Sequence, residues 1–187
     1  MSTLSIEHLS VSAGEKQLLS DISLTLQSGE MHILMGPNGS GKSSLLNALM
    51  GHPRYTITEG KMVLDGEEIT SLSTEKKAKL GLFLSLQHLP EIAGVTLTNF
   101  LHRAAKEVKG STQGPLEFYR ASEAKAKEAG IDPVFLKKHV NTGLSGGEKK
   151  QSEVLQLLIL EPKFAFLDEI DSGVDVDAMK KVYAGIE

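Results

Sequence analysis

The chain has 187 residues, of which 40% are hydrophobic and 24% charged, as in one globular domain or a domain with a small subdomain. Its net charge of −4 argues against a nucleic-acid partner, and the absence of cysteine excludes disulfides and fits a reducing, cytoplasmic compartment. No apolar run approaches the ~20 residues that a membrane-spanning helix needs, and residues 1–11 do not resemble a secretory signal. We therefore expect no direct membrane insertion.

Strands and helices alternate along the first half of the chain, which predicts an α/β fold. Residues 31–35 form a compact apolar run, which predicts a buried strand, and residues 76–79 (KKAK) predict a solvated helix face. The other expected elements are strands over residues 4–11, 22–26, 61–64, 67–69 and 80–86 and a helix over residues 43–50, ended by Gly51 and Pro53.

The second half begins with polar helical stretches that glycine and proline interrupt, with helices expected over 97–108 and 115–129. We interpret residues 90–140 as a helical, partner-facing subdomain inserted into an α/β core made of residues 1–89 and 141–187, and we expect this core to be incomplete at its C-terminal end. The core elements expected after the insertion are a helix over 146–160, with Leu155, Leu158 and Ile159 in the core, a strand over 163–167 and a last helix over 176–186.

Residues 36–43 read GPNGSGKS, which matches the phosphate-binding pattern G-x-x-x-x-G-K-[ST]. Glycines let the backbone turn tightly and point N–H groups inward, and the positive end of the following helix faces the same anion. We expect Lys42 to reach the β- and γ-phosphates of ATP and Ser43 to bind Mg²⁺. The full predicted set is Gly36, Pro37, Asn38, Gly39, Ser40, Gly41, Lys42, Ser43 and Ser44.

Residues 164–169 read FAFLDE, an apolar strand that ends in two carboxylates. Ligands of open parallel sheets bind at the carboxyl ends of the strands. Asp168 is therefore expected to hold Mg²⁺, and Glu169 to polarise the attacking water.

Residues 144–148 read LSGGE, in which Ser145, Gly146 and Gly147 open a helix whose N–H groups favour an anion. Ser145 and Glu148 also have the spacing of a capping box. The two interpretations are compatible.

The phosphate loop, Gln87 after an apolar strand, LSGGE and FLDE follow one another as in ABC-type ATPase domains, which the chain resembles over its whole length. The resemblance implies a P-loop fold with an antiparallel β edge and a helical subdomain. It implies that Gln87 contacts Mg²⁺ or the attacking water. It further implies an ATP-dependent homodimer in which Ser145, Gly146 and Gly147 contact the partner's ATP and Asp175 crosses the interface.

Three strings, HLPEIAGVT (88–96), LSGGEKKQSEVLQ (144–156) and LDEIDSGVDVDA (167–178), resemble the SufC group, the ATPases of SUF iron–sulfur cluster assembly. That resemblance implies SufB- and SufD-like scaffold partners whose shape ATP-driven closure changes. The alternatives are the ATP-binding subunit of an ABC membrane transporter and a nucleotide-responsive module without turnover.

Two features depart from the ABC pattern. Ala13 stands where many members place an adenine-stacking aromatic ring. The six histidines all precede Asp168, so the histidine that the family places after the interface loop is absent from these 187 residues. We therefore expect the chain to bind nucleotide through Lys42 but to hydrolyse it poorly.

Overall fold

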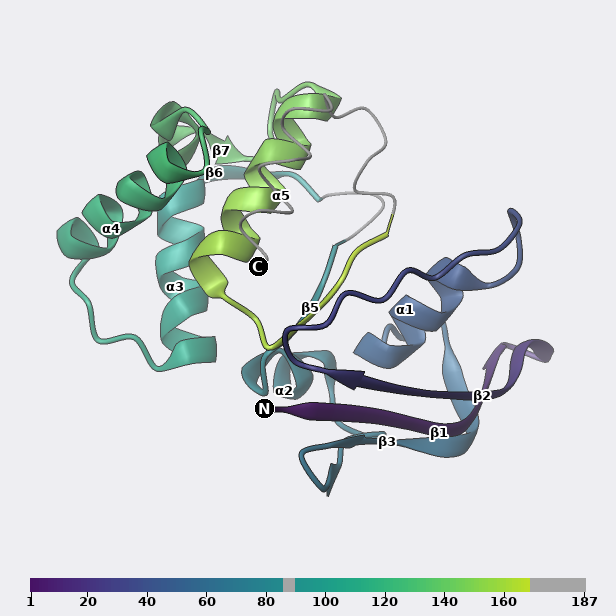
Figure 1. The fold of residues 1–187 in the computed structure, drawn as a ribbon. Coiled ribbons are helices and arrows are strands. Elements are labelled where there is room, and N and C mark those ends of the chain that lie inside the picture. Colours follow the sequence, from purple (N-terminus) through teal and green to yellow (C-terminus); the bar gives the residue numbers. More distant parts are fainter. Residues whose placement is uncertain (86–89, 169–187) are drawn as a thin grey trace. The chain divides into compact units, whose positions relative to one another are not determined.

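The computed structural model describes residues 1–85 and 90–168 (Figure 1). The chain divides into two compact units, residues 1–84 and residues 85–187, which we treat separately.

Unit 1 is built on an antiparallel sheet of order β2-β1-β3-β4 (Figure 1). The strands are β1 (Thr3–Ala13), β2 (Lys16–Gln27), β3 (Thr56–Leu64) and β4 (Glu67–Glu68). On β1, the buried residues Leu4 and Ile6 are two positions apart, and so are Leu9 and Val11. Ile6 and Leu9, however, are three positions apart, so the alternation of buried and exposed side chains shifts by one residue between these two pairs. The shift coincides with a register change and with the positive φ of His8 (51°), which together mark a β-bulge. The bulge thus returns the apolar face of the strand to the core.

The helices of unit 1 are α1 (Lys42–Met50) and α2 (Thr74–Lys79), and its last strand is β5 (Leu82–Leu84). The expected solvated face of residues 76–79 is wrong at one position, because Lys77 is completely buried. Its Nζ donates to the Leu49 carbonyl at 2.9 Å, in the last turn of α1. Carbonyls at a helix C-terminus lack intrahelical partners and favour a cation, which explains how a lysine is accommodated here.

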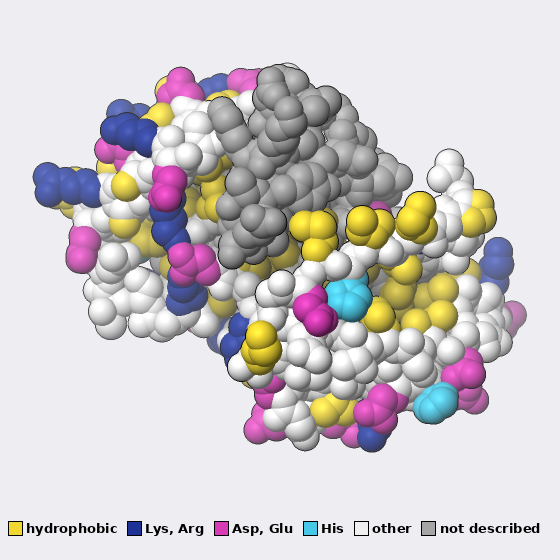
Figure 2. Space-filling view, viewed as in Figure 1, with side chains coloured by type: hydrophobic (Ala, Val, Ile, Leu, Met, Phe, Trp, Pro, Cys, Tyr) yellow, Lys and Arg dark blue, Asp and Glu magenta, His cyan; other side chains and the backbone are white. Residues whose placement is uncertain are grey.

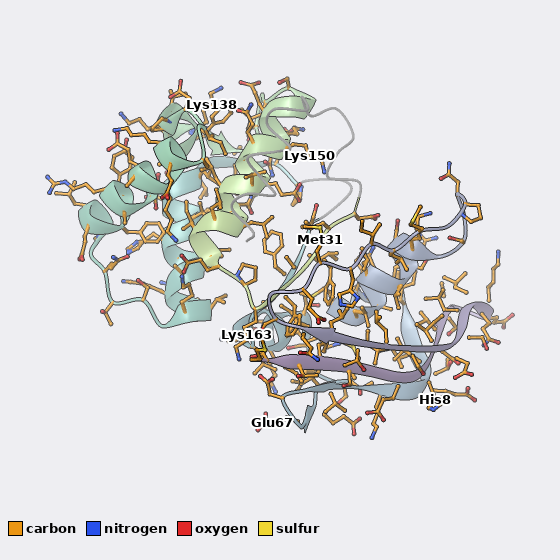
Figure 3. All side chains as sticks on the ribbon, in the orientation of Figure 1. His8, Met31, Glu67, Lys138, Lys150 and Lys163 are labelled. Atoms are coloured by element: carbon orange, nitrogen blue, oxygen red, sulfur yellow. The ribbon has the colours of Figure 1, made fainter. Side chains whose placement is uncertain are left out.

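The strand expected over residues 31–35 is also wrong, since no strand forms there. The side chains of Met31, Ile33 and Met35 are 56%, 79% and 85% exposed. Figure 2 shows a row of hydrophobic side chains on the surface in this view, and Figure 3 labels Met31. Hydropathy predicts that a segment prefers burial, but a strand also requires a neighbouring backbone to pair with.

Unit 2 is mainly helical and contains a short antiparallel pair between β6 and β7. Its described elements are β6 (Ile92–Thr96), α3 (Leu97–Lys109), α4 (Pro115–Glu128), η1 (Pro133–Lys137), β7 (His139–Val140), α5 (Gly146–Leu160) and β8 (Phe164–Phe166). One apolar cluster joins α3, α4, η1 and α5, and it includes Leu101, Phe118, Leu136, Leu155 and Ile159. The core positions expected at Leu155 and Ile159 are therefore confirmed, whereas Leu158 is only partly buried.

Glu161, the residue after α5, forms hydrogen bonds with lysines near the ends of α3 and α4. Its carboxylate accepts from Lys109 Nζ of α3 at 2.5 Å and from Lys125 Nζ of α4. Lys125 also donates to the Leu158 carbonyl in the last turn of α5 at 2.9 Å. The hydrogen bonds from Lys109 and then Lys125 lower the pKa of Glu161 below its usual 4.5.

We expect Glu161→Gln to lower the free energy of unfolding by no more than about 1 kcal/mol at pH 7, because the carboxylate is about half exposed to solvent. A lowered carboxyl pKa stabilises the fold above the ordinary value of 4.5, and this contribution disappears as the pH falls. Urea unfolding at pH 7 and pH 3 measures both effects. Glu128→Gln, at an exposed position of α4, serves as the control. An equal loss at the two pH values would contradict an ionic origin.

The division of the core into residues 1–89 and 141–187 remains a prediction, although α5 packs with α3 and α4 in unit 2. None of the helices in the described residues combines the length and hydropathy needed to cross a bilayer.

Candidate functional site

The phosphate loop, residues 36–43, follows β2 and continues into the first two residues of α1 in unit 1, and residues 36–40 are exposed. Lys42 Nζ donates to the carbonyls of Gly36 at 2.7 Å and Pro37 at 3.0 Å. The lysine side chain therefore curls back over the loop that precedes it, and its ammonium lies against these two loop carbonyls.

The loop delivers free backbone donors at the start of α1. Gly41 is the N-cap and provides no side-chain acceptor, and the first amide to bond back is that of Leu45, to the Gly41 carbonyl. The amides of Lys42, Ser43 and Ser44 therefore have no acceptor within the helix and can bind an anion. The left-handed φ of Gly41, 97°, favours glycine at this turn.

We expect Gly41→Ala to weaken ATP binding and to cost about 1–2 kcal/mol of stability, because a φ of 97° disfavours any side chain and an added Cβ, 2.6 Å from Leu19 Cδ2, would displace the Leu19 side chain. Gly66→Ala is the matched control: its φ is also positive, 89°, but a Cβ there meets nothing within 4 Å. Urea unfolding with and without ATP separates the two effects. Equal ATP affinities for the two variants would contradict the close fit at Gly41.

In unit 2, the LSGGE segment forms the start of α5. The Ser145 N–H donates to Glu148 Oε2 at 2.8 Å, and the Glu148 N–H donates to Ser145 Oγ at 3.4 Å. The predicted capping box is thus confirmed. Because Ser145 Oγ accepts this bond, its own O–H remains able to donate to an anion.

Lys138 completes this arrangement from the residue after η1. Its Nζ lies 2.7 Å from Glu148 Oε1. Bonds from Lys138, followed by those from Ser145, lower the pKa of Glu148 to about 2. No pattern in the sequence indicates this contact, because Lys138 and Glu148 are ten residues apart and no periodicity relates them.

Of the two carboxylates expected to face the phosphates, Asp168 is described; it follows β8 in unit 2 and is 8% exposed. Gln87, Glu169 and Asp175 lie outside the described residues. The phosphate loop belongs to unit 1, whereas Ser145, Gly146, Gly147 and Asp168 belong to unit 2. The meeting of these groups in one site therefore remains a prediction.

Ser43 and Asp168 offer a hydroxyl and a carboxylate, the hard oxygen ligands that Mg²⁺ prefers, so their chemistry fits this ion. Among the residues that the structure describes, no group of three or more His, Asp or Glu side chains could hold a metal by itself.

These features define a P-loop nucleotide-binding domain: a glycine-rich loop, a lysine that contacts the loop carbonyls, and a following helix whose first amides have no acceptor within the helix. The family model described as ABC transporter matches residues 19–172. The chain therefore belongs to the ABC transporter family, and it is an ATP-binding ABC ATPase domain.

Similar proteins in bacteria support this assignment. The chain is 44% identical over 187 residues to vegetative protein 296 of Bacillus subtilis strain 168, covering 99% of this chain and 72% of the relative. It is 45% identical over 188 residues to a probable ABC transporter ATP-binding protein of Streptococcus pyogenes serotype M3, covering 100% and 73%.

Solved structures show the same fold. A dimeric bacterial ABC transporter cassette, MJ0796, superposes with a TM-score of 0.82 at 20% identity, over 98% of this chain and 81% of that chain. The ATP-binding subunit of an ABC transporter gives the same TM-score at 22% identity, over 98% and 72%. The predicted P-loop ABC ATPase fold, with its antiparallel β edge, is confirmed.

Proposed function

We propose that the chain is the ATP-hydrolysing subunit of an ABC transporter, and that nucleotide-driven pairing of two copies moves a membrane partner. The observation that carries the proposal is the phosphate loop, in which the Lys42 ammonium lies against the Gly36 and Pro37 carbonyls and the amides at the start of α1 have no acceptor within the helix. Relatives over the whole chain are named as probable ABC transporter ATP-binding proteins, which favours a transporter over a scaffold.

Within one copy, Lys42 and the amides around Gly39, Gly41 and Ser43 would bind the β- and γ-phosphates. Ser43, Gln87 and Asp168 would hold Mg²⁺, which when bound supplies positive charge beside the phosphate oxygens. Glu169 would accept a proton from the water that attacks the γ-phosphate.

Across the dimer, the Ser145 hydroxyl and the amides of Gly146 and Gly147 would contact the γ-phosphate held by the second copy, with Asp175 at the interface. The open start of α5 supports this role, because Ser145 and Gly146 are exposed and the Ser145 O–H can donate. A cassette of this fold is known as a dimer, and one such dimer holds ADP and phosphate.

The turnover role is tested by Glu169→Gln. The wild-type chain should hydrolyse ATP at the low rate expected above, whereas the variant should accumulate as an ATP-bound dimer in size-exclusion chromatography with light scattering. An ATPase rate that the substitution leaves unchanged would contradict the assigned role of Glu169.

A SufB/SufD-like scaffold is the second candidate partner, because residues 88–96, 144–156 and 167–178 resemble the ATPases of that system. Purification of a tagged chain from its native host distinguishes a membrane transporter partner from a soluble scaffold partner. We expect it to copurify with an integral membrane protein; copurification with soluble scaffold proteins would overturn the transporter assignment in favour of the second candidate.

A further inference from the structure

The Lys138 side chain is held at two points in unit 2. Its Nζ lies 4.6 Å from the centroid of the Phe135 ring, and Phe135 belongs to the apolar core of the unit. The same Nζ lies 2.7 Å from Glu148 Oε1. Figure 3 labels Lys138 near the β6–β7 end of unit 2. The ammonium is thus anchored to the core on one side and to the first turn of α5 on the other.

Glu148 divides its two carboxylate oxygens between different donors. Oε1 accepts from Lys138, and Oε2 accepts the Ser145 N–H at 2.8 Å. A carboxylate held at one oxygen can present the other in a fixed direction, so Lys138 orients the acceptor that fixes the Ser145 backbone. The Ser145 hydroxyl is set in turn, because its oxygen accepts the Glu148 N–H.

Charge gives Lys138 a second effect. With a pKa of about 2, Glu148 is ionised at neutral pH and places a negative charge three residues from Ser145. That charge would repel a triphosphate approaching the start of α5. The Lys138 ammonium compensates it at short range.

We propose that Lys138 is a positioning residue for the anion grip at the start of α5: acting through Glu148, it holds Ser145 in place and removes a repulsive charge from the path of the partner's triphosphate. The inference rests on the proposed function, since it concerns the contact of LSGGE with ATP on a second copy. Lys138 does not itself touch the nucleotide.

The test compares Lys138→Met with Lys137→Met in the full chain carrying Glu169→Gln. Lys137 is the matched control, because it is the neighbouring lysine and its Nζ lies over the Tyr119 ring, 5.9 Å from the centroid. Sedimentation velocity with MgATP measures dimerisation, and a fluorescent ATP analogue measures nucleotide binding to the monomer. We expect Lys138→Met to weaken ATP-dependent dimerisation about tenfold, the effect of one charge-assisted hydrogen bond. Monomer affinity for the analogue should stay unchanged, and so should both properties of the Lys137 variant.

Three further readouts separate positioning from general stability. Lys138→Arg should restore most of the dimerisation, and Lys138→Met should have no added effect when combined with Glu148→Gln. Carboxyl NMR should show the pKa of Glu148 rising from about 2 toward its usual 4.5 in Lys138→Met. Lys138→Gln, which keeps a polar end group, provides a second variant if the methionine lowers the folded fraction.

Ser145→Ala distinguishes failure of this inference from failure of the proposed function. If Ser145→Ala weakens dimerisation but Lys138→Met and Lys138→Gln do not, the positioning role of Lys138 is wrong, and the contact between Ser145 and the partner's ATP is kept. If Ser145→Ala also leaves dimerisation unchanged, Ser145 does not contact the partner's ATP, and both the proposed contact and the role of Lys138 are wrong. Additive losses for Lys138→Met and Glu148→Gln would likewise overturn an action through Glu148.

Discussion

Lys42→Met is expected to lower the affinity for ATP about a hundredfold. The ammonium contacts the carbonyls of Gly36 and Pro37 and lies where the β- and γ-phosphates would be bound. Each hydrogen bond to a charged group contributes roughly 1.5–3 kcal/mol, so loss of one or two accounts for this factor. Isothermal titration calorimetry with ATP and Mg²⁺ measures it.

Lys76→Met is the control for Lys42, because Lys76 is an exposed lysine of α2 with the same charge and length. It removes one positive charge from unit 1 without touching the loop. Similar losses of affinity for both variants would mean that overall charge, not the Lys42 ammonium, governs binding. An unchanged affinity for Lys42→Met would remove the basis for the phosphate site.

Local signals in the sequence were sufficient to predict the helix that carries LSGGE. The expected bounds, residues 146–160, match α5 (Gly146–Leu160). Ser145 and Glu148 define its start through the capping box, and Pro162 follows its end. The phosphate loop was found in the same way, because its chemistry depends on residues that are adjacent in the chain.

The features that were missed depend on contacts between distant residues. Lys77 lies in a run of lysines that predicts a solvated face, yet α2 directs it onto the end of α1. Composition cannot reveal which of the three lysines in this run contacts a carbonyl in the last turn of another helix. The strand predicted over residues 31–35 is wrong for a different reason. Their hydropathy predicts burial, but a strand also needs a neighbouring strand to pair with, and the segment itself does not specify one.

The other large effect concerns stability. Lys77→Ala is expected to lower the free energy of unfolding by about 3 kcal/mol, because Lys77 is fully buried and truncation leaves both a cavity and a Leu49 carbonyl without its 2.9 Å donor. Lys76→Ala, one residue away and exposed, should change it by less than about 0.5 kcal/mol. Urea unfolding followed by circular dichroism gives both values.

The pH dependence of the stability shows whether the buried Lys77 amine gains and loses its proton in the expected range. Burial lowers the pKa of Lys77 from 10.5 to about 8. Between these values the unfolded chain binds a proton that the folded chain has released, so this lysine makes stability rise with pH, by at most about 1.4 kcal/mol per pH unit. Lys77→Met keeps the volume but not the proton, and the stability difference between wild type and Lys77→Met should therefore shift in favour of the wild type from pH 8 to pH 10. A difference that stays constant over this range would show that Lys77 does not titrate there, and would leave only its volume and its hydrogen bond to explain the loss in Lys77→Ala.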